Sequence, residues 1–188
     1  MTFKVAFISI CVLWVLGELT ISRILRSGAA TSARDAGSLR LILVAAYSCT
    51  AAGVCIALVS RSGSLPDAAA QQWIGLGMIV AGIVIRVISI RTLRRFFTVD
   101  VAVLPDHHLI RKGPYRYLRH PSYTGALLCF YGLSVALANA WSALVIVVPV
   151  TAAFLYRIHV EESVLRSAFP HEYPEYERTT ARLIPYLY

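Results

Sequence analysis

The sequence predicts an all-α integral membrane protein with about five transmembrane helices, a small cytoplasmic hairpin and a helical C-terminal tail. Three observations lead to this fold class. Hydrophobic residues make up 57% of the 188 residues, and charged residues only 15%. The apolar residues fall in runs long enough to cross a bilayer as a helix, which needs about 20 residues. Most basic residues flank these runs and do not interrupt them.

Four apolar runs define the predicted spans, and they cover residues 3–21, 39–59, 73–90 and 123–158. The last run is about twice the length of one span, so we expect it to fold back as a helical hairpin. Asn139, close to Trp141, is the natural tip of this hairpin. We expect one domain over residues 1–188, with three spans in 1–93 and a second half in 94–188. The first run is too long for the apolar part of a signal peptide, and we expect it to be retained.

Basic residues predict the orientation of the chain in the membrane. The loop after the first run carries Arg23, Arg26, Arg34 and Arg40, which by the positive-inside rule makes it cytoplasmic. The N-terminus then lies outside, and the C-terminus and the arginine-rich segment 91–119 lie in the cytoplasm. The net charge of +8 is therefore explained by topology and anionic lipids, and we expect no nucleic-acid partner.

The cysteines and histidines give no sign of a metal site. The cysteines lie inside predicted spans and form no CxxC pair, so we interpret them as small buried side chains; they are Cys11, Cys49, Cys55 and Cys129. The histidines show no HExxH spacing, and we expect no metal.

Two polar segments on the predicted cytoplasmic side are larger than connections need to be. The first has a β-like run over 97–103, a turn at Pro105 and Asp106, and a second short run over 108–111, which together predict a small hairpin. The second segment follows Arg157. We expect a helix to continue out of the membrane there, to break near Pro170 and to resume before Pro185.

The string GPYRYLRHPSYTG, residues 113–125, indicates a binding site at the start of a helix. Proline is favoured in the first turn of a helix, so the fourth span should begin at Pro121 with His120 near its N-cap. The free N–H groups of this helix start would attract an anionic group of a cofactor. The alternative is that Arg116, Arg119 and His120 only anchor the helix at lipid headgroups.

Charged residues in or beside the spans need partners. Glu161 and Glu162 follow the fifth span, where a carboxylate opposes the helix dipole, so a cationic partner such as Arg157 or a bound ribose is expected. An ordinary solvated helix end is the alternative. Arg86 lies within the third span, and we expect it to pair with Glu18 of the first span or, alternatively, to face a substrate.

The string at 113–125, the pair Glu161 and Glu162, and the segment FPHEYPEYERTTARLIP at 169–185 together resemble the isoprenylcysteine carboxyl methyltransferase family of membrane enzymes. The resemblance covers roughly the C-terminal half, from Phe97 to Pro185. It implies a methyltransferase that uses S-adenosylmethionine, bound between the last two spans, the hairpin and the tail, and that does not have the soluble methyltransferase fold.

The resemblance also implies roles for individual residues. Along the hairpin, the cofactor would be lined by Leu109, Ile110, Gly113 and Tyr115. Its amino-acid end would be held by Arg119, His120, Pro121 and Tyr123, and the polar part of its nucleoside side would meet Glu162. The acceptor of such an enzyme would be the C-terminal carboxylate of an isoprenylcysteine. Arg157 is the arginine we expect to orient that carboxylate, with Glu161 steering it.

Other functions remain open from the sequence. The acceptor could instead be another lipid, a phenol or a thiol. The RHPSYTG string and the terminal PYLY also resemble the C-terminal half of membrane sterol reductases, which use NADPH. A third alternative is a nonenzymatic membrane protein, although the polar groups gather on one side and not at mid-membrane, where transporter sites usually lie.

Overall fold

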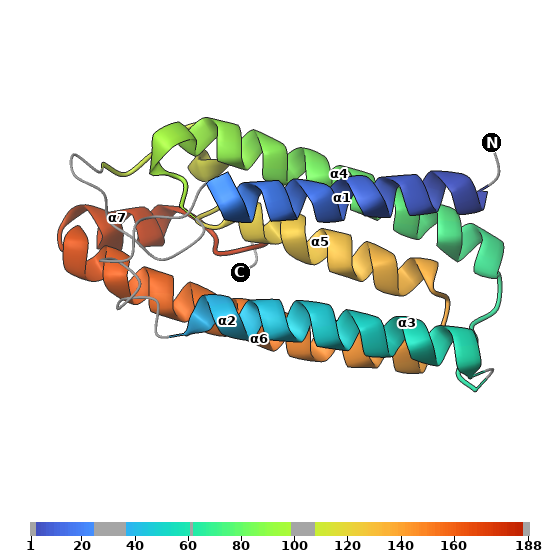
Figure 1. Cartoon of the computed structure of the whole chain (residues 1–188). Helices are drawn as coiled ribbons and strands as arrows, with labels where there is room; N and C mark the ends of the chain where they lie inside the picture. Colours follow the sequence, from blue (N-terminus) through green and yellow to red (C-terminus); the bar gives the residue numbers. More distant parts are fainter. Residues whose placement is uncertain (1–2, 25–36, 61, 99–107, 186–188) are drawn as a thin grey trace.

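The computed structural model describes residues 3–24, 37–60, 62–98 and 108–185, and these residues form a bundle of long helices. In chain order the helices and helical turns are α1 (Phe3–Ile24), α2 (Ser38–Val44), η2 (Ala45–Cys49), α3 (Thr50–Val59), α4 (Ala68–Leu93), η3 (Arg94–Phe96), η4 (Gly113–Arg116), α5 (Pro121–Ala136), α6 (Ala140–Ala168) and α7 (Glu172–Thr179). The elements α2, η2 and α3 follow one another without a break and form one helical rod (Figure 1).

The long helices confirm the predicted all-helical fold. Among the described residues, four helices are long and apolar enough to cross a membrane: Phe3–Ile24, Ser38–Val59, Ala68–Phe96 and Ala140–Ala168. The fifth long helix, α5, has 16 residues, which gives it a length of about 24 Å. It pairs with α6 as the predicted hairpin, and Asn139 caps α6 by accepting a hydrogen bond from the backbone N–H of Ser142.

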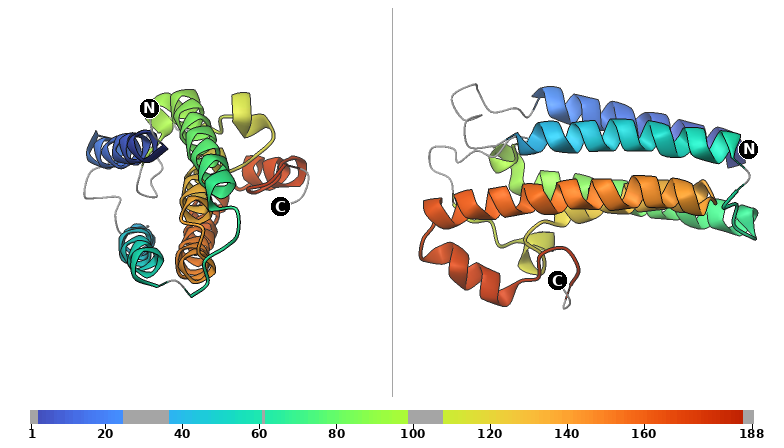
Figure 2. Two further views of the ribbon diagram at one scale, coloured as in Figure 1. Left: turned by 90° about the vertical axis from the view of Figure 1, so that its right-hand side faces the viewer. Right: turned by 90° about the horizontal axis from the view of Figure 1, so that it is seen from below.

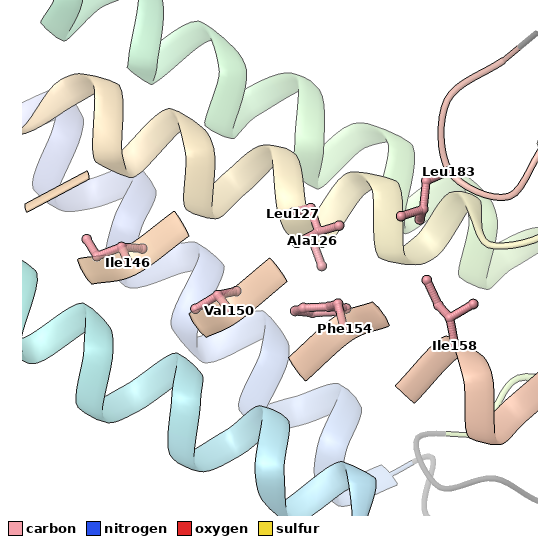
Figure 3. Packing of buried hydrophobic residues seen from close by; sticks show 7 residues of the cluster. All are labelled: Ala126, Leu127, Ile146, Val150, Phe154, Ile158 and Leu183. Carbon is pink, nitrogen blue, oxygen red and sulfur yellow. The ribbon is translucent and has the colours of Figure 1, made fainter. Parts of the chain in front are cut away.

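The helices are arranged in a central layer with partners on both faces. Helices α4, α5 and α6 form the layer, while α1 and the α2–α3 rod lie on one face of it (Figure 2). Helix α7 lies on the opposite face, beside the end of the layer where α5 begins. The core between α5 and α6 also takes in Leu183 of the C-terminal tail, so the tail is part of the packed structure (Figure 3).

Helices α4 and α5 touch through glycines. Gly75 and Gly82 of α4 face Gly132 and Gly125 of α5, so the two backbones approach directly. A Cβ on Gly132 would lie 2.6 Å from the carbonyl oxygen of Gly75 and 2.9 Å from the backbone nitrogen of Ile79. Small residues at such contacts allow the close van der Waals packing that joins helices in a membrane. The contact fixes the start of α5 against α4.

An ion pair joins α1 to this pair of helices, as the sequence predicts. Arg86 contacts both carboxylate oxygens of Glu18, with Nη2 lying 2.7 Å from Oε2. Its Nη1 also donates to the Ser122 hydroxyl at 2.8 Å, so one guanidinium links α1, α4 and α5. A charge in an apolar span is tolerated when it is paired in this way.

The C-terminal segment follows the prediction, whereas the predicted hairpin cannot be followed. Helix α6 extends to Ala168, the helical conformation is interrupted at 169–171, and α7 begins at Glu172. The hairpin's turn and most of its first run lie in 99–107, outside the described residues. Residues 108–111, its second run, are not in a strand.

Replacing Gly132 with alanine should destabilise the protein. The added methyl group would meet the α4 backbone, and forcing extra atoms into a packed contact costs about 2 kcal/mol. Thermal unfolding in detergent should show a lower midpoint for Gly132→Ala. Gly77→Ala is the matched control, because nothing lies within 4 Å of a Cβ at that position of α4. Equal midpoints for the two variants would contradict this account of the α4–α5 contact.

Candidate active site

Helix α5 begins where the sequence predicts. His120 is the N-cap residue and Pro121 opens the helix, and both are buried. The carbonyl of His120 accepts from the backbone N–H groups of Tyr123 and Thr124, each at 3.0 Å. The His120 ring stacks on the ring of Tyr123, with centroids 5.5 Å apart. These contacts fix the direction in which His120 and Tyr123 leave the helix.

Glu162 is the centre of a buried cluster of charges. Its side chain is 2% exposed, and its carboxylate contacts Arg119 at 3.0 Å, Arg182 at 3.0 Å and His120 at 3.3 Å. Arg166, one turn later on α6, lies 3.4 Å away. These side chains come from the segment before α5, from α6 and from the tail. A buried carboxylate is stable only with such partners, so Glu162 holds three parts of the chain in one place.

The C-terminal tail crosses the start of α5 and is bonded to it. Backbone hydrogen bonds run from Arg119 N–H to the Ala181 carbonyl at 2.8 Å and from His120 N–H to the Arg182 carbonyl at 3.1 Å. The Tyr176 hydroxyl of α7 donates to the Tyr115 carbonyl at 2.6 Å. Burial raises the pKa of the Tyr176 hydroxyl above its ordinary value, so the group stays a proton donor.

A first cavity, here called the polar cavity, lies between the end of α4, the start of α5, the end of α6 and α7. The described residues enclose about 100 Å³. Its wall combines aliphatic and aromatic side chains with ionisable groups, and consists of Leu93, Phe96, Phe97, Thr98, Leu109, Ile110, Tyr115, Arg119, His120, Ser122, Tyr123, Glu161, Val164, Leu165, Tyr173 and Tyr176. Such a wall suits a ligand with a flat apolar part and a charged part.

A second cavity, here called the apolar cavity, lies among α1, the α2–α3 rod, α5 and α6. It measures about 350 Å³. Most of its lining is hydrocarbon or aromatic, from Trp14, Val15, Ile21, Leu39, Ile42, Leu43, Ala46, Tyr47, Ala51, Phe97, Tyr123, Ala126, Phe130 and Phe154, and its other residues are Glu18, Ser22, Thr50, Arg86, Thr98 and Arg157. Its size and lining fit a hydrocarbon chain that ends in a polar group.

Tyr123 stands between the two cavities and belongs to the wall of both. Its hydroxyl donates to Oε2 of Glu161 at 2.7 Å, on the polar side, and accepts from Nε of Arg157 at 3.1 Å, on the apolar side. Phe97 and Thr98 are the other residues that line both cavities. The two spaces are therefore neighbours, and a ligand in one would lie close to a ligand in the other.

Most of the residues singled out in the sequence meet here. The polar cavity is lined by Leu109, Ile110, Tyr115, Arg119, His120, Tyr123 and Glu161, and the apolar cavity by Tyr123 and Arg157. Three others do not line either cavity: Pro121 opens α5, Glu162 holds the charge cluster, and Gly113 lies beside Thr92 of α4. Of the two adjacent glutamates, Glu161 faces the polar cavity.

Sequence reasoning missed several lining residues and one contact. Val164 and Leu165, three and four residues after Glu161, line the polar cavity, and helical periodicity could have indicated them. Tyr173 of α7 also lines this cavity. Ser38, which bonds to Arg157 at 2.7 Å, has no local signal that could have found it.

Comparison with known proteins identifies relatives of this chain. The model of the isoprenylcysteine carboxyl methyltransferase (ICMT) family matches residues 73–167. Protein-S-isoprenylcysteine O-methyltransferases A and B of Arabidopsis thaliana are 38% and 35% identical over 123 residues, with 62% of this chain and 62% of each relative covered. The corresponding enzyme of Saccharomyces cerevisiae is 31% identical over 116 residues, with 61% of this chain and 48% of the yeast protein covered.

A solved structure is also similar. The structure of the eukaryotic intramembrane Ras methyltransferase ICMT matches with a TM-score of 0.58 and 29% identity, over 77% of this chain and 52% of that one. The chain thus spans less than two thirds of the length of these relatives. The family match covers about half of the chain and contains α5, most of α6 and the residues of both that line the polar cavity. This chain is therefore a member of the isoprenylcysteine carboxyl methyltransferase family.

Proposed function

We propose that this protein transfers a methyl group from S-adenosylmethionine to the C-terminal carboxylate of an isoprenylcysteine. The observation that carries the proposal is the pair of cavities that meet at Tyr123. One has the mixed wall that a charged nucleoside needs, and the other has the hydrocarbon wall that a prenyl chain needs. A reaction between a soluble cofactor and a lipid requires two such neighbouring sites.

The polar cavity is the proposed cofactor site, and its residues fit the chemistry of that cofactor. Leu109, Ile110 and Tyr115 offer an apolar surface to the adenine ring, and Gly113 shapes the segment that carries them. The carboxylate of Glu161, in the wall of the cavity, suits ribose hydroxyls or the amino group. The cavity is smaller than an ordinary ligand pocket, so binding would need lining side chains to move.

The start of α5 would receive the amino-acid end of the cofactor. Arg119, His120 and Tyr123 border the cavity at this point, next to Pro121 at the start of the helix. Glu162 contacts Arg119 and His120 directly. We therefore assign Glu162 the task of holding these two side chains in place beneath the cofactor.

The apolar cavity is the proposed site of the prenyl chain. It is framed by α1 and the α2–α3 rod, so its occupant would come from the bilayer between these helices (Figure 2). Arg157 lies in its wall beside Tyr123. A guanidinium can bind a carboxylate through two parallel hydrogen bonds, which fixes the direction of its oxygens. Arg157 would thus present the acceptor carboxylate towards the polar cavity.

The chemistry then depends mainly on positioning. S-adenosylmethionine supplies a methyl group on a positively charged sulfur, which is open to in-line attack. A carboxylate is ionised near pH 7, so the protein need not provide a strong base. Arg157 would orient the attacking oxygen, Glu161 would orient Arg157 through the Tyr123 hydroxyl, and the aromatic walls would exclude water. Aligning two bound reactants can supply roughly 7 to 11 kcal/mol of the rate enhancement.

The first test is the reaction itself. Purified protein in detergent or nanodiscs should transfer labelled methyl from S-adenosylmethionine to N-acetyl-S-farnesylcysteine, and the product should be a base-labile ester. N-acetylcysteine, which lacks the prenyl chain, is the matched control and should not react. Turnover of a lipid amine, phenol or thiol in place of the farnesyl compound would overturn the assigned acceptor. Binding of NADPH with no binding of S-adenosylmethionine would overturn the reaction class.

Arg157→Ala should lose turnover and retain the cofactor. Removing the partner of a bound carboxylate costs about 3 kcal/mol, which corresponds to a roughly 100-fold lower kcat/KM for the prenylated acceptor. Calorimetry should show an unchanged affinity for S-adenosylmethionine. Arg178→Ala, at the end of α7, is the control and should keep both. An equal loss of turnover and cofactor affinity in Arg157→Ala would contradict its assignment to the acceptor.

Substitutions of the two adjacent glutamates should affect different properties, namely stability for Glu162 and affinity for S-adenosylmethionine for Glu161. Glu162→Gln removes the charge that Arg119, Arg166 and Arg182 share, and breaking such a cluster costs about 3 kcal/mol or more of stability. Its thermal midpoint should therefore fall sharply. Glu161→Gln, whose side chain is 29% exposed, should keep its midpoint and lose about tenfold in affinity for S-adenosylmethionine. A stable Glu162→Gln protein would contradict the structural role given to this residue.

A further inference from the structure

Arg157 donates hydrogen bonds from two different nitrogens of its guanidinium. Its Nε donates to the Tyr123 hydroxyl at 3.1 Å, and its Nη1 donates to the Ser38 hydroxyl at 2.7 Å. Arg157 is only 1% exposed although it lies on a cavity wall. A guanidinium is planar, so hydrogen bonds at two of its nitrogens fix both its position and the orientation of its plane.

The two anchors of Arg157 come from opposite parts of the chain. Tyr123 belongs to α5, within the segment that matches the family. Ser38 is the first residue of α2, outside that segment, and it is fully buried. Gly37 precedes it with a φ of 72°, a left-handed conformation that favours glycine and turns the chain into the helix. The backbone thus delivers the Ser38 hydroxyl to a fixed point beside α6.

A hydroxyl at a fully buried position needs a partner, because an unsatisfied one is costly. The hydrogen bond to a charged guanidinium meets this need and is stronger than a bond between neutral groups. It also removes rotational freedom from a long side chain. The Ser38 hydroxyl therefore limits where the charge of Arg157 can lie.

We propose that Ser38 is a positioning residue for the acceptor carboxylate, acting through Arg157. The proposal rests on the function proposed above. Ser38 and Tyr123 hold the guanidinium from two sides, and this sets the line along which the acceptor oxygen faces the polar cavity. The N-terminal half of the chain thus contributes to the reaction geometry as well as to the walls of the apolar cavity.

The test compares Ser38→Ala with Ser38→Thr, which keeps the hydroxyl, and with Ser48→Ala. Ser48 lies in the same helical rod, and its hydroxyl bonds to the Val44 carbonyl of its own helix at 2.5 Å. Ser38→Ala should lower kcat for N-acetyl-S-farnesylcysteine about tenfold, the effect of one hydrogen bond to a charged group. Its KM for S-adenosylmethionine should stay at the wild-type value. Ser38→Thr should restore turnover, and Ser48→Ala should match wild type.

A binding measurement separates positioning from a structural role. Wild-type protein should bind N-acetyl-S-farnesylcysteine, which has a free carboxylate, more tightly than the methyl ester of the same compound. Ser38→Ala should lose most of this preference while it still binds the ester. A Ser38→Ala protein with wild-type kcat would overturn the proposal. So would a protein whose thermal midpoint and both KM values worsen together.

The proposal can also be judged if wild-type protein shows no turnover, an outcome that refutes the proposed function. In that case the ¹⁵N-labelled arginine side chains are followed by NMR, with the Arg157 signals assigned from Arg157→Lys. A change of the Arg157 Nη signals in Ser38→Ala that is absent in Ser48→Ala would support the positioning of this guanidinium. Unchanged Arg157 signals in Ser38→Ala would overturn it.

Discussion

The site depends on one buried carboxylate. Glu162 contacts arginines from the segment before α5, from α6 and from the tail. These parts of the chain also meet in the hydrophobic core through Leu183, Leu127 and Ile158, and the shared charge adds a polar link beside that core. A single ionic centre is compact and directional, but it fails as a unit when one member is removed. Arg119 and His120 in the wall of the polar cavity are held in place by this carboxylate.

The rest of the bundle is held by different forces. Between α4 and α5 the backbones meet through glycines, where dispersion forces act over short distances. At the edge of the layer, α1 is joined through the pair of Glu18 and Arg86. This division leaves the space between α1 and the α2–α3 rod without a close helix contact, and the apolar cavity occupies it. Loose packing at this place is therefore compatible with a rigid α4–α5 pair.

The sequence predicts the helices well and the site in part. Apolar runs reveal the spans through their length alone, and Pro121 marks the start of α5 correctly. The pairing of Arg86 with Glu18 is also confirmed, because a charge in a span needs a partner. Helix α4 begins at Ala68, before the predicted Trp73, since alanine and glutamine favour a helix without adding to an apolar run.

The sequence could not predict how a helix is rotated about its axis or which distant segments of the chain meet. Glu161 and Glu162 are neighbours, and only the packing of α6 decides that one faces the polar cavity and the other the charge cluster. Glu162 contacts Arg182 of the tail, and Arg157 donates a hydrogen bond to Ser38 of α2. Such contacts between distant segments leave no local pattern.

The bonds of Asn139 have a mechanical consequence for the opposite end of the bundle. Its side chain donates to the carbonyls of Ser60 and Ser62 while it caps α6, so the α3–α4 and α5–α6 connections are tied together. This end of the bundle is therefore the natural pivot for a tilt of the α2–α3 rod. A rod of 22 residues is about 33 Å long, so a tilt of about 5° at the pivot would part the other end by about 3 Å. Such a tilt would widen the gap beside Tyr123 and part Ser38 from Arg157, so this bond holds the guanidinium only while the rod lies against α6.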